Sequence, residues 1–167
     1  IKCNPSIKYE SDRLALINAL LTDKIDIIAT DHAPHTWEEK SQSYSKAPAG
    51  LPLVQHGMQI LMDFYHQDIL SLETIVQKTS HNVANRFQVK ERGYIREGYY
   101  ADLTVLDIDK PYTVSNDNIL YKCGWSPFNG HTFQSSIFMT IVNGNIAFKD
   151  GQVAEDLPFG MQIEFDR

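Results

Sequence analysis

Cysteine is scarce in this sequence. The chain has two, Cys3 and Cys123, which lie far apart and outside any Cys-x-x-Cys spacing. This number and spacing exclude a disulfide framework and a cysteine-rich zinc finger. Because disulfides are rare in reducing compartments, we expect a cytoplasmic protein.

Basic runs and long apolar segments are missing as well. Asp and Glu number 21 against 15 Lys and Arg, so the net charge is -6 and no basic stripe can follow a nucleic-acid backbone. The strongest apolar stretch, around residues 14–21, is interrupted by Asn18 and is far too short to cross a bilayer. We expect a soluble protein that binds neither nucleic acid nor membrane. No signal-peptide pattern opens the sequence. The chain begins with Ile1 rather than Met, and residues 1–5 are typical of the tail of a strand that enters a turn, so we expect a cut start.

What the sequence does contain is enough for a core, since 43% of its residues are hydrophobic. Apolar positions recur at helical spacing from Ser11, and Ser11 or Asp12 can cap the first turn. Residues 25–30 are apolar and β-branched, which is typical of a strand buried on both faces. That strand would deliver Asp31 and His32 at its carboxyl end. A helix followed by a buried strand predicts an α/β fold.

The middle of the chain is a polar stretch followed by two amphipathic patterns. Residues 35–51 are mostly polar, with Pro48 and Gly50 near the end, and predict a long loop of the functional kind. Apolar positions within residues 54–65 and 71–83 predict two helices.

The pattern of the sequence changes from helical to strand-like after about residue 90. Residues 101–107 predict a strand, and the segments 137–142 and 145–149 flank Asn143-Gly144, the pair typical of a type I′ hairpin turn. We therefore expect a β-rich subdomain in this part of the chain.

Residues 30–35, Thr-Asp-His-Ala-Pro-His, place a carboxylate and two imidazoles just beyond the predicted buried strand. Catalytic groups collect at such strand ends in parallel α/β barrels. Asp31 could ligate a metal through one oxygen and take a proton from water with the other. An isolated Asp-His pair is more often a turn cap beside ordinary loop histidines, so the surrounding residues decide between the two interpretations.

Those surroundings resemble class I dihydroorotases. Residues 30–35, then Glu38-Glu39-Lys40 and Ala-Pro-Ala-Gly at 47–50, are similar to the segment that closes the barrel in that family. Residues 2–5 resemble its Asn-Pro-Pro segment, although 6–8 read Ser-Ile-Lys where Pro-Leu-Arg is common, and Ala49 stands where Phe is usual. The strand at 101–107 resembles the Ala-Asp-Leu-x-x-x-Asp strand of amidohydrolases.

The resemblance implies a fold. Residues 1–90 would form the end of a (β/α)8 TIM-type hydrolase barrel, with its last strand, active-site loop and helices. Residues 91–167 would form a small β-sandwich subdomain.

The resemblance also implies residue roles. Asp31 matches the family's metal ligand and general base, Asn4 and His35 match residues that hold dihydroorotate, and Ala49 and Gly50 match a loop pair whose backbone contacts the ring. From the residues alone, Asn4 and His35 could also be ordinary turn and loop residues. His32 could steady Asp31, whereas Glu38 to Lys40 and the four histidines at 56, 66, 81 and 131 are expected to be solvated or core residues.

The implied reaction is the reversible, zinc-dependent hydrolysis of dihydroorotate to carbamoyl aspartate in pyrimidine biosynthesis, with one or two zinc ions. The family's other metal ligands include a His-x-His pair, which this sequence lacks, so the isolated chain should be inactive. The possible macromolecular partners are a second copy of the chain or an aspartate transcarbamoylase. Two alternatives stay open: a hydantoinase- or allantoinase-type cyclic amidohydrolase, and a non-catalytic dihydroorotase-like scaffold.

Overall fold

The computed structural model describes residues 2–156 and 159–166. Helix α1 spans Glu10–Leu21, one residue earlier than expected, and Asp12 accepts a hydrogen bond from the Tyr9 backbone N–H at 3.3 Å. The predicted loop at 35–51 contains a short helix, α2 (Trp37–Lys40), which polar composition had hidden. Thr36 caps it, because its hydroxyl accepts from the Glu39 N–H.

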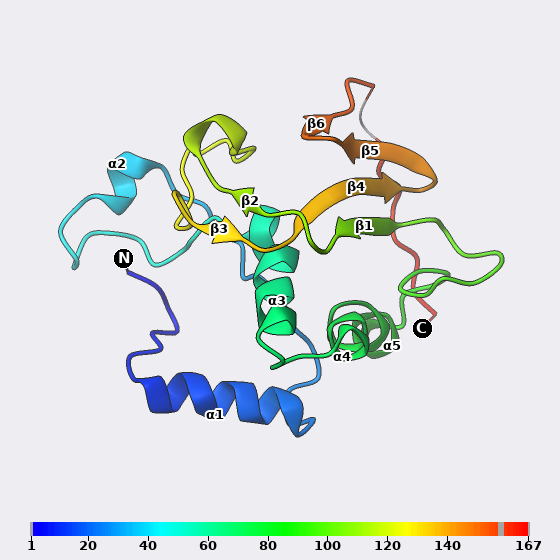
Figure 1. Cartoon of the computed structure of the whole chain (residues 1–167), viewed down its shortest axis with the longest axis horizontal. Coiled ribbons are helices and arrows are strands. Elements are labelled where there is room, and N and C mark those ends of the chain that lie inside the picture. The colour runs from blue at the N-terminus through cyan, green and yellow to red at the C-terminus, as the bar shows by residue number, and fades with distance from the viewer. Residues whose placement is uncertain (1, 157–158, 167) are drawn as a thin grey trace.

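Both helices expected in the middle of the chain are confirmed, with irregular parts. The 3-10 turn η1 (Val54–His56) leads into α3 (Gly57–His66), which lies at the centre of the molecule in Figure 1. The second helical region consists of α4 (Leu72–Val76), the π-helical turn η2 (Gln77–His81) and α5 (Asn82–Phe87).

The β-rich part begins with β1 (Leu103–Asp107), and the predicted hairpin is formed by β4 (Ser136–Val142) and β5 (Asn145–Lys149). Asn143 and Gly144 have φ values of 50° and 82°, as a type I′ turn requires. These strands and β6 (Gln152–Val153) form an antiparallel sheet in the order β1-β4-β5-β6. β2 (Tyr112–Thr113) pairs with β3 (Thr132–Phe133) in a second, two-stranded sheet. The 3-10 turn η3 (Asn116–Asn118) lies between these strands in the sequence.

The strand expected at residues 25–30 is not formed. A run rich in apolar, β-branched residues is typical of a strand buried on both faces. A strand also needs a neighbouring strand to pair with, and among the described residues none runs beside this segment. Side chains and backbone of the second helical region hold it instead. The hydrogen bonds run from Ile28 N to Lys78 O (3.0 Å), from Lys78 Nζ to Ile25 O (2.7 Å) and from Asn82 Nδ2 to Asp26 O (2.8 Å).

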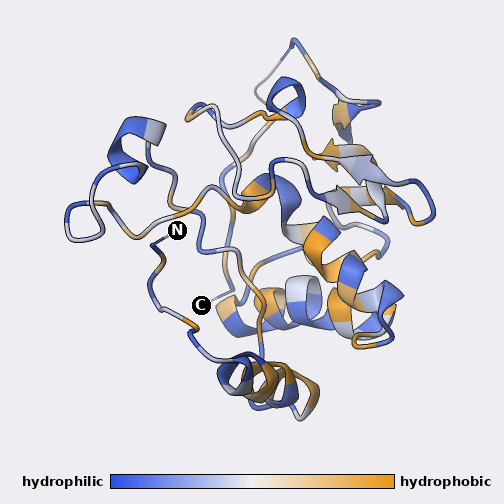
Figure 2. Ribbon diagram, turned by 60° about the vertical axis from the view of Figure 1, so that its left-hand side comes forward, coloured by the Kyte–Doolittle hydropathy of each residue, from blue (hydrophilic) through white to orange (hydrophobic). Residues whose placement is uncertain are grey.

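The main core lies between α3 and α4. Leu61, Met62, Leu70 and Ile75 are buried there, and partly buried side chains from α1, from residue 28 and from β1 pack against them. By contrast, Leu14, Leu16 and Leu21 of α1 are 44–52% exposed, and Figure 2 shows hydrophobic positions along that helix. Among the described residues, no helix has the length and apolarity to cross a membrane.

Candidate active site

Asp31 lies at the carboxyl end of the segment 25–30, exposed and with φ of 48°. A positive φ is uncommon for a residue with a side chain, although Asp tolerates it better than most. Within the described part of the chain, nothing hydrogen-bonds to its carboxylate. The structure therefore presents an uncommitted carboxylate where the sequence predicts the metal ligand and base.

His32, the next residue, is fixed by backbone groups. Its Nδ1 accepts hydrogen bonds from Leu53 N at 3.0 Å and from Val54 N at 3.2 Å. In the neutral ring the proton must then be on Nε2. The ring also lies 5.3 Å from the ring of Tyr121. His32 thus connects the backbone beside Asp31 to the start of η1, and its steadying of Asp31 stays a prediction.

The two ends of the loop that follows are joined. Ala33 N donates to Leu51 O at 3.0 Å, beside an isolated parallel bridge between His32 and Leu51. A Cβ added to Gly50 would lie 2.2 Å from Ala33 O and 2.7 Å from Ala33 Cβ. Position 50 therefore needs glycine for close approach of two backbones.

His35 is the predicted carboxylate-binding residue. Its Nδ1 lies 3.5 Å from Glu39 Oε2, and its backbone oxygen accepts a 2.7 Å hydrogen bond from the indole of Trp125. It borders an open cavity of about 520 Å³ between the loop and the segment 120–123. The polar and titratable residues around this cavity include His32, His35, Thr36, Glu39, Tyr121, Lys122 and Cys123.

The other predicted site residues lie outside that cavity lining. Asn4, in a cis peptide with Pro5, is exposed, and Ala49 and Gly50 are half-buried. Of the five predicted residues, His35 lines the cavity and Asp31, Asn4, Ala49 and Gly50 do not. The joined ends of the loop bring the backbone beside Asp31 close to that of Ala49 and Gly50, but the five side chains are not gathered around one cavity.

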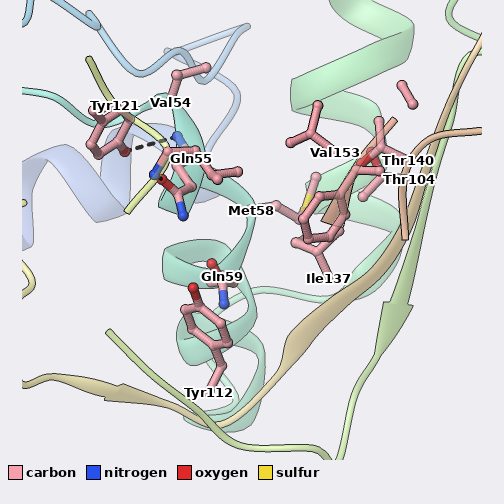
Figure 3. Close-up of a pocket in the computed structure, with 13 residues that line it drawn as sticks. Val54, Gln55, Met58, Gln59, Thr104, Tyr112, Tyr121, Ile137, Thr140 and Val153 are labelled. Atoms are coloured by element: carbon pink, nitrogen blue, oxygen red, sulfur yellow. Dashed lines mark hydrogen bonds between the residues drawn. The ribbon is translucent and has the colours of Figure 1, made fainter. Parts of the chain in front are cut away.

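Sequence reasoning missed the residues of the 120–125 segment. Tyr121 and Trp125 reach the loop from the β-rich part of the chain, where they carried no pattern that pointed to a site. The only available signal was their aromatic type, because Tyr and Trp carry a hydrogen-bonding group on a ring that is usually partnered when buried. Figure 3 shows Tyr121 accepting from the backbone N–H of Gln55.

His56 was expected to be a surface or core residue, and it is core. The residue is 0% exposed, its ring is stacked on Phe133, and its Nδ1 lies 3.3 Å from the Tyr121 hydroxyl. Its Nε2 has no partner among the described residues. Burial lowers the pKa of His56 from 6.5 to about 4, because the charged ring cannot be solvated.

Among the described residues, no group of three or more His, Cys, Asp or Glu side chains could hold a metal ion. Zinc sites have about four ligands. The uncommitted carboxylate of Asp31 offers the oxygen atoms that one such ligand would supply, and a zinc site that included it would need further ligands than the described residues group together.

The fold has clear counterparts among known proteins. The sequence profile described as "Amidohydrolase family" matches residues 3–147, so the chain belongs to the amidohydrolase family.

More particular relatives are dihydroorotases. The chain is 37% identical over 150 residues to the dihydroorotase of Clostridium acetobutylicum, covering 89% of this chain and 35% of that protein. It is 39% identical over 150 residues to the dihydroorotase of Fusobacterium nucleatum, with the same coverage of 89% and 35%. The chain thus spans about a third of the length of the curated relatives it matches.

Solved structures of hydantoinases share the fold. The L-hydantoinase of Arthrobacter aurescens superposes with a TM-score of 0.87 at 25% identity, covering 97% of this chain and 37% of that one. The D-hydantoinase of a Thermus species gives a TM-score of 0.80 at 24% identity, covering 92% and 34%. Mixed α/β architecture of the amidohydrolase type is therefore confirmed.

Proposed function

We propose that this chain forms the carboxy-terminal part of a dihydroorotase, which hydrolyses the cyclic amide of dihydroorotate reversibly to carbamoyl aspartate in pyrimidine biosynthesis. The observation that carries the proposal is the uncommitted, exposed carboxylate of Asp31 at the end of segment 25–30. It stands in a chain that is 32–39% identical to dihydroorotases over about nine-tenths of its length.

In this proposal the chain contributes two parts to a longer polypeptide, called here the complete enzyme. Residues 1–90 supply the last strand, loop and helices of the (β/α)8 barrel, and 91–167 supply a small β-sandwich subdomain. The order of elements supports this division, because helices dominate up to Phe87 and strands follow from Leu103. In the complete barrel, residues 25–30 would gain the neighbouring backbone that a strand needs.

Asp31 acts as the general base of the proposed reaction. Its carboxylate takes a proton from the attacking water and later returns it to the departing ring nitrogen. Zinc, one or two ions with Asp31 among their ligands, would polarise the ring carbonyl and favour ionisation of the water.

Four residues of this chain contact the substrate in the proposal. His35 meets the carboxylate of dihydroorotate, and Asn4 hydrogen-bonds to its ring amide, since both types offer donors to an anionic, amide-bearing ring. Ala49 and Gly50 contact the ring through their backbone, which the close approach of Gly50 to Ala33 holds in place. A cytoplasmic location, and a second copy or an aspartate transcarbamoylase as macromolecular partner, belong to the same proposal.

A hydantoinase-type activity is the second candidate, because the hydantoinase structures share the fold with a TM-score up to 0.87. Substrate preference decides between the two. The complete enzyme should show a higher kcat/KM for dihydroorotate than for hydantoin or dihydrouracil. A preference for the uncharged rings would support the hydantoinase alternative, and hydrolysis of none of them by the zinc-loaded enzyme would support the scaffold.

Metal analysis tests whether the zinc ligands are divided between this chain and the remainder of the complete enzyme. Purified residues 1–167 should retain no stoichiometric zinc after dialysis against a weak chelator, because no group of described His, Cys, Asp or Glu side chains could hold a metal ion. One tightly bound zinc per chain would contradict the proposed architecture.

A further inference from the structure

Lys40, at the end of α2, joins two segments that are far apart in the sequence. Its ammonium group donates hydrogen bonds of 2.8 Å to the backbone oxygen of Lys2 and of 2.8 Å to that of Pro48. Lys2 precedes Asn4 by two residues, and Pro48 directly precedes Ala49. The two accepting oxygens thus belong to the two segments that carry predicted substrate contacts.

The environment of Lys40 suits a fixed cation rather than a solvated one. Its side chain is partly buried, and burial lowers its pKa from the ordinary value of a lysine. A buried ammonium group must have its donors satisfied, and two backbone oxygens satisfy two of its three. The Lys40 ammonium group, expected in a solvated stretch of the loop, is thus partly covered and held by two backbone oxygens.

Lys2 makes a further bond to the loop, but at its tip. Lys2 Nζ donates to Tyr44 O at 3.1 Å, and this bond is exposed to solvent. Among the described residues, no backbone hydrogen bond joins residues 2–8 to 47–50. Lys40 is thus the partly buried connection between them.

We propose that Lys40 is a positioning residue that sets the distance between Asn4 and the Ala49–Gly50 pair, and so the width of the site that receives the substrate ring. The inference rests on the proposed function, because it takes these residues as substrate contacts. Helix α2 serves it by holding Lys40 in place: Thr36 and Glu39 cap the helix reciprocally, with N···O distances of 3.0 and 3.3 Å.

Steady-state kinetics of the complete enzyme provide the first test. Lys40→Met keeps the length of the side chain and removes the charge and all donors. We expect a KM for dihydroorotate at least tenfold higher with a kcat changed less than about threefold, because ground-state contacts are displaced while Asp31 is not. Lys40→Arg can still donate to two oxygens and should bring KM back to within about threefold of wild type.

Lys46→Met is the matched control, since Lys46 lies on the same loop and its side chain is exposed. It should leave KM and kcat unchanged. If Lys40→Met lowers the melting temperature but leaves KM unchanged, or if Lys40→Arg fails to restore KM, the positioning role is overturned.

Hydrogen exchange separates this inference from the proposed function. In Lys40→Met, amides of residues 3–8 and 49–53 should exchange faster than in wild type, whereas those of α3 should not. If the wild-type enzyme did not hydrolyse dihydroorotate but Lys40→Met still exchanged faster at these segments, the positioning role would stand and the proposed substrate would be wrong. Unchanged exchange at both segments would reject the positioning role.

Discussion

The indole Nε1 of Trp125 donates a 2.7 Å hydrogen bond to the backbone oxygen of His35, ninety residues away. Trp125 is 7% exposed and packs edge-on against Trp37, with ring centroids 5.7 Å apart. A residue of the β-rich part of the chain therefore fixes the backbone of the predicted carboxylate-binding histidine.

Trp125→Phe tests that relationship by removing the donor while keeping an aromatic ring. In the complete enzyme the free energy of unfolding should fall by about 1 kcal/mol, the net value of one hydrogen bond. KM for dihydroorotate should rise more than kcat falls. Trp37→Phe is the control, because Trp37 is 57% exposed. Equal effects of the two substitutions on KM would contradict the role of the hydrogen bond.

Asp31→Asn keeps the size of the side chain but removes the base. General-base catalysis contributes about a hundredfold to ten-thousandfold, so kcat of the complete enzyme should fall by at least that factor. Asp26→Asn, which changes another exposed carboxylate five residues earlier, should have little effect. If Asp31→Asn retains more than about a tenth of wild-type turnover, Asp31 is not the base.

His35→Ala should act through the charge of the substrate. Loss of a hydrogen bond to a charged group costs roughly 1.5–3 kcal/mol, so kcat/KM for dihydroorotate should fall by about ten- to a hundredfold. Uncharged dihydrouracil should be affected less, and Asn4→Ala should cause a smaller loss with dihydroorotate. If His35→Ala lowered kcat/KM equally for charged and uncharged rings, His35 would not bind the substrate carboxylate.

His56 should make stability depend on pH. Its pKa is lowered in the folded state to about 4 from the ordinary 6.5, so between these values the unfolded chain binds more protons than the folded one. Stability is therefore complete above pH 6.5 and is lost as the pH falls toward 4, by roughly 3 kcal/mol at most.

Denaturant unfolding of the complete enzyme at pH 7 and pH 4.5 measures this effect. His56→Phe keeps the stacking on Phe133 and removes the titrating ring, so its stability should fall less between these two pH values than that of wild type. The same decrease in both proteins would assign the acid sensitivity to other groups.

Local patterns in the sequence predicted local structure well. The apolar spacing of α1 and α3 and the Asn143-Gly144 turn each depend on neighbours a few residues away, and the structure confirms all three. Residues 25–30 failed because strand formation depends on partners distant in the sequence. Helix α2 was missed because its four residues are polar, and only the Thr36–Glu39 capping box signalled it.

The candidate site was predictable to a similar extent. Asp31 was found because an apolar, β-branched run ends directly before it in the sequence, and its exposed position agrees with its predicted role, which stays a prediction. The contributions of Lys40, Tyr121 and Trp125 could not be read from the sequence. Each of these side chains hydrogen-bonds to a backbone group at least eight residues away. Sequence patterns relate residues a few positions apart, so they do not predict such a partner.

The joined ends of the loop between Ala33 and Gly50 have a consequence for variation. Because the Ala33–Leu51 hydrogen bond and the close approach of Gly50 fix both ends, the tip at residues 41–46 can change in length without moving Asp31. Each doubling of loop length costs only about 0.6 kcal/mol in closure entropy. The tip is therefore the part of the loop where insertions should be tolerated best, because the junction beside Asp31 does not depend on its length.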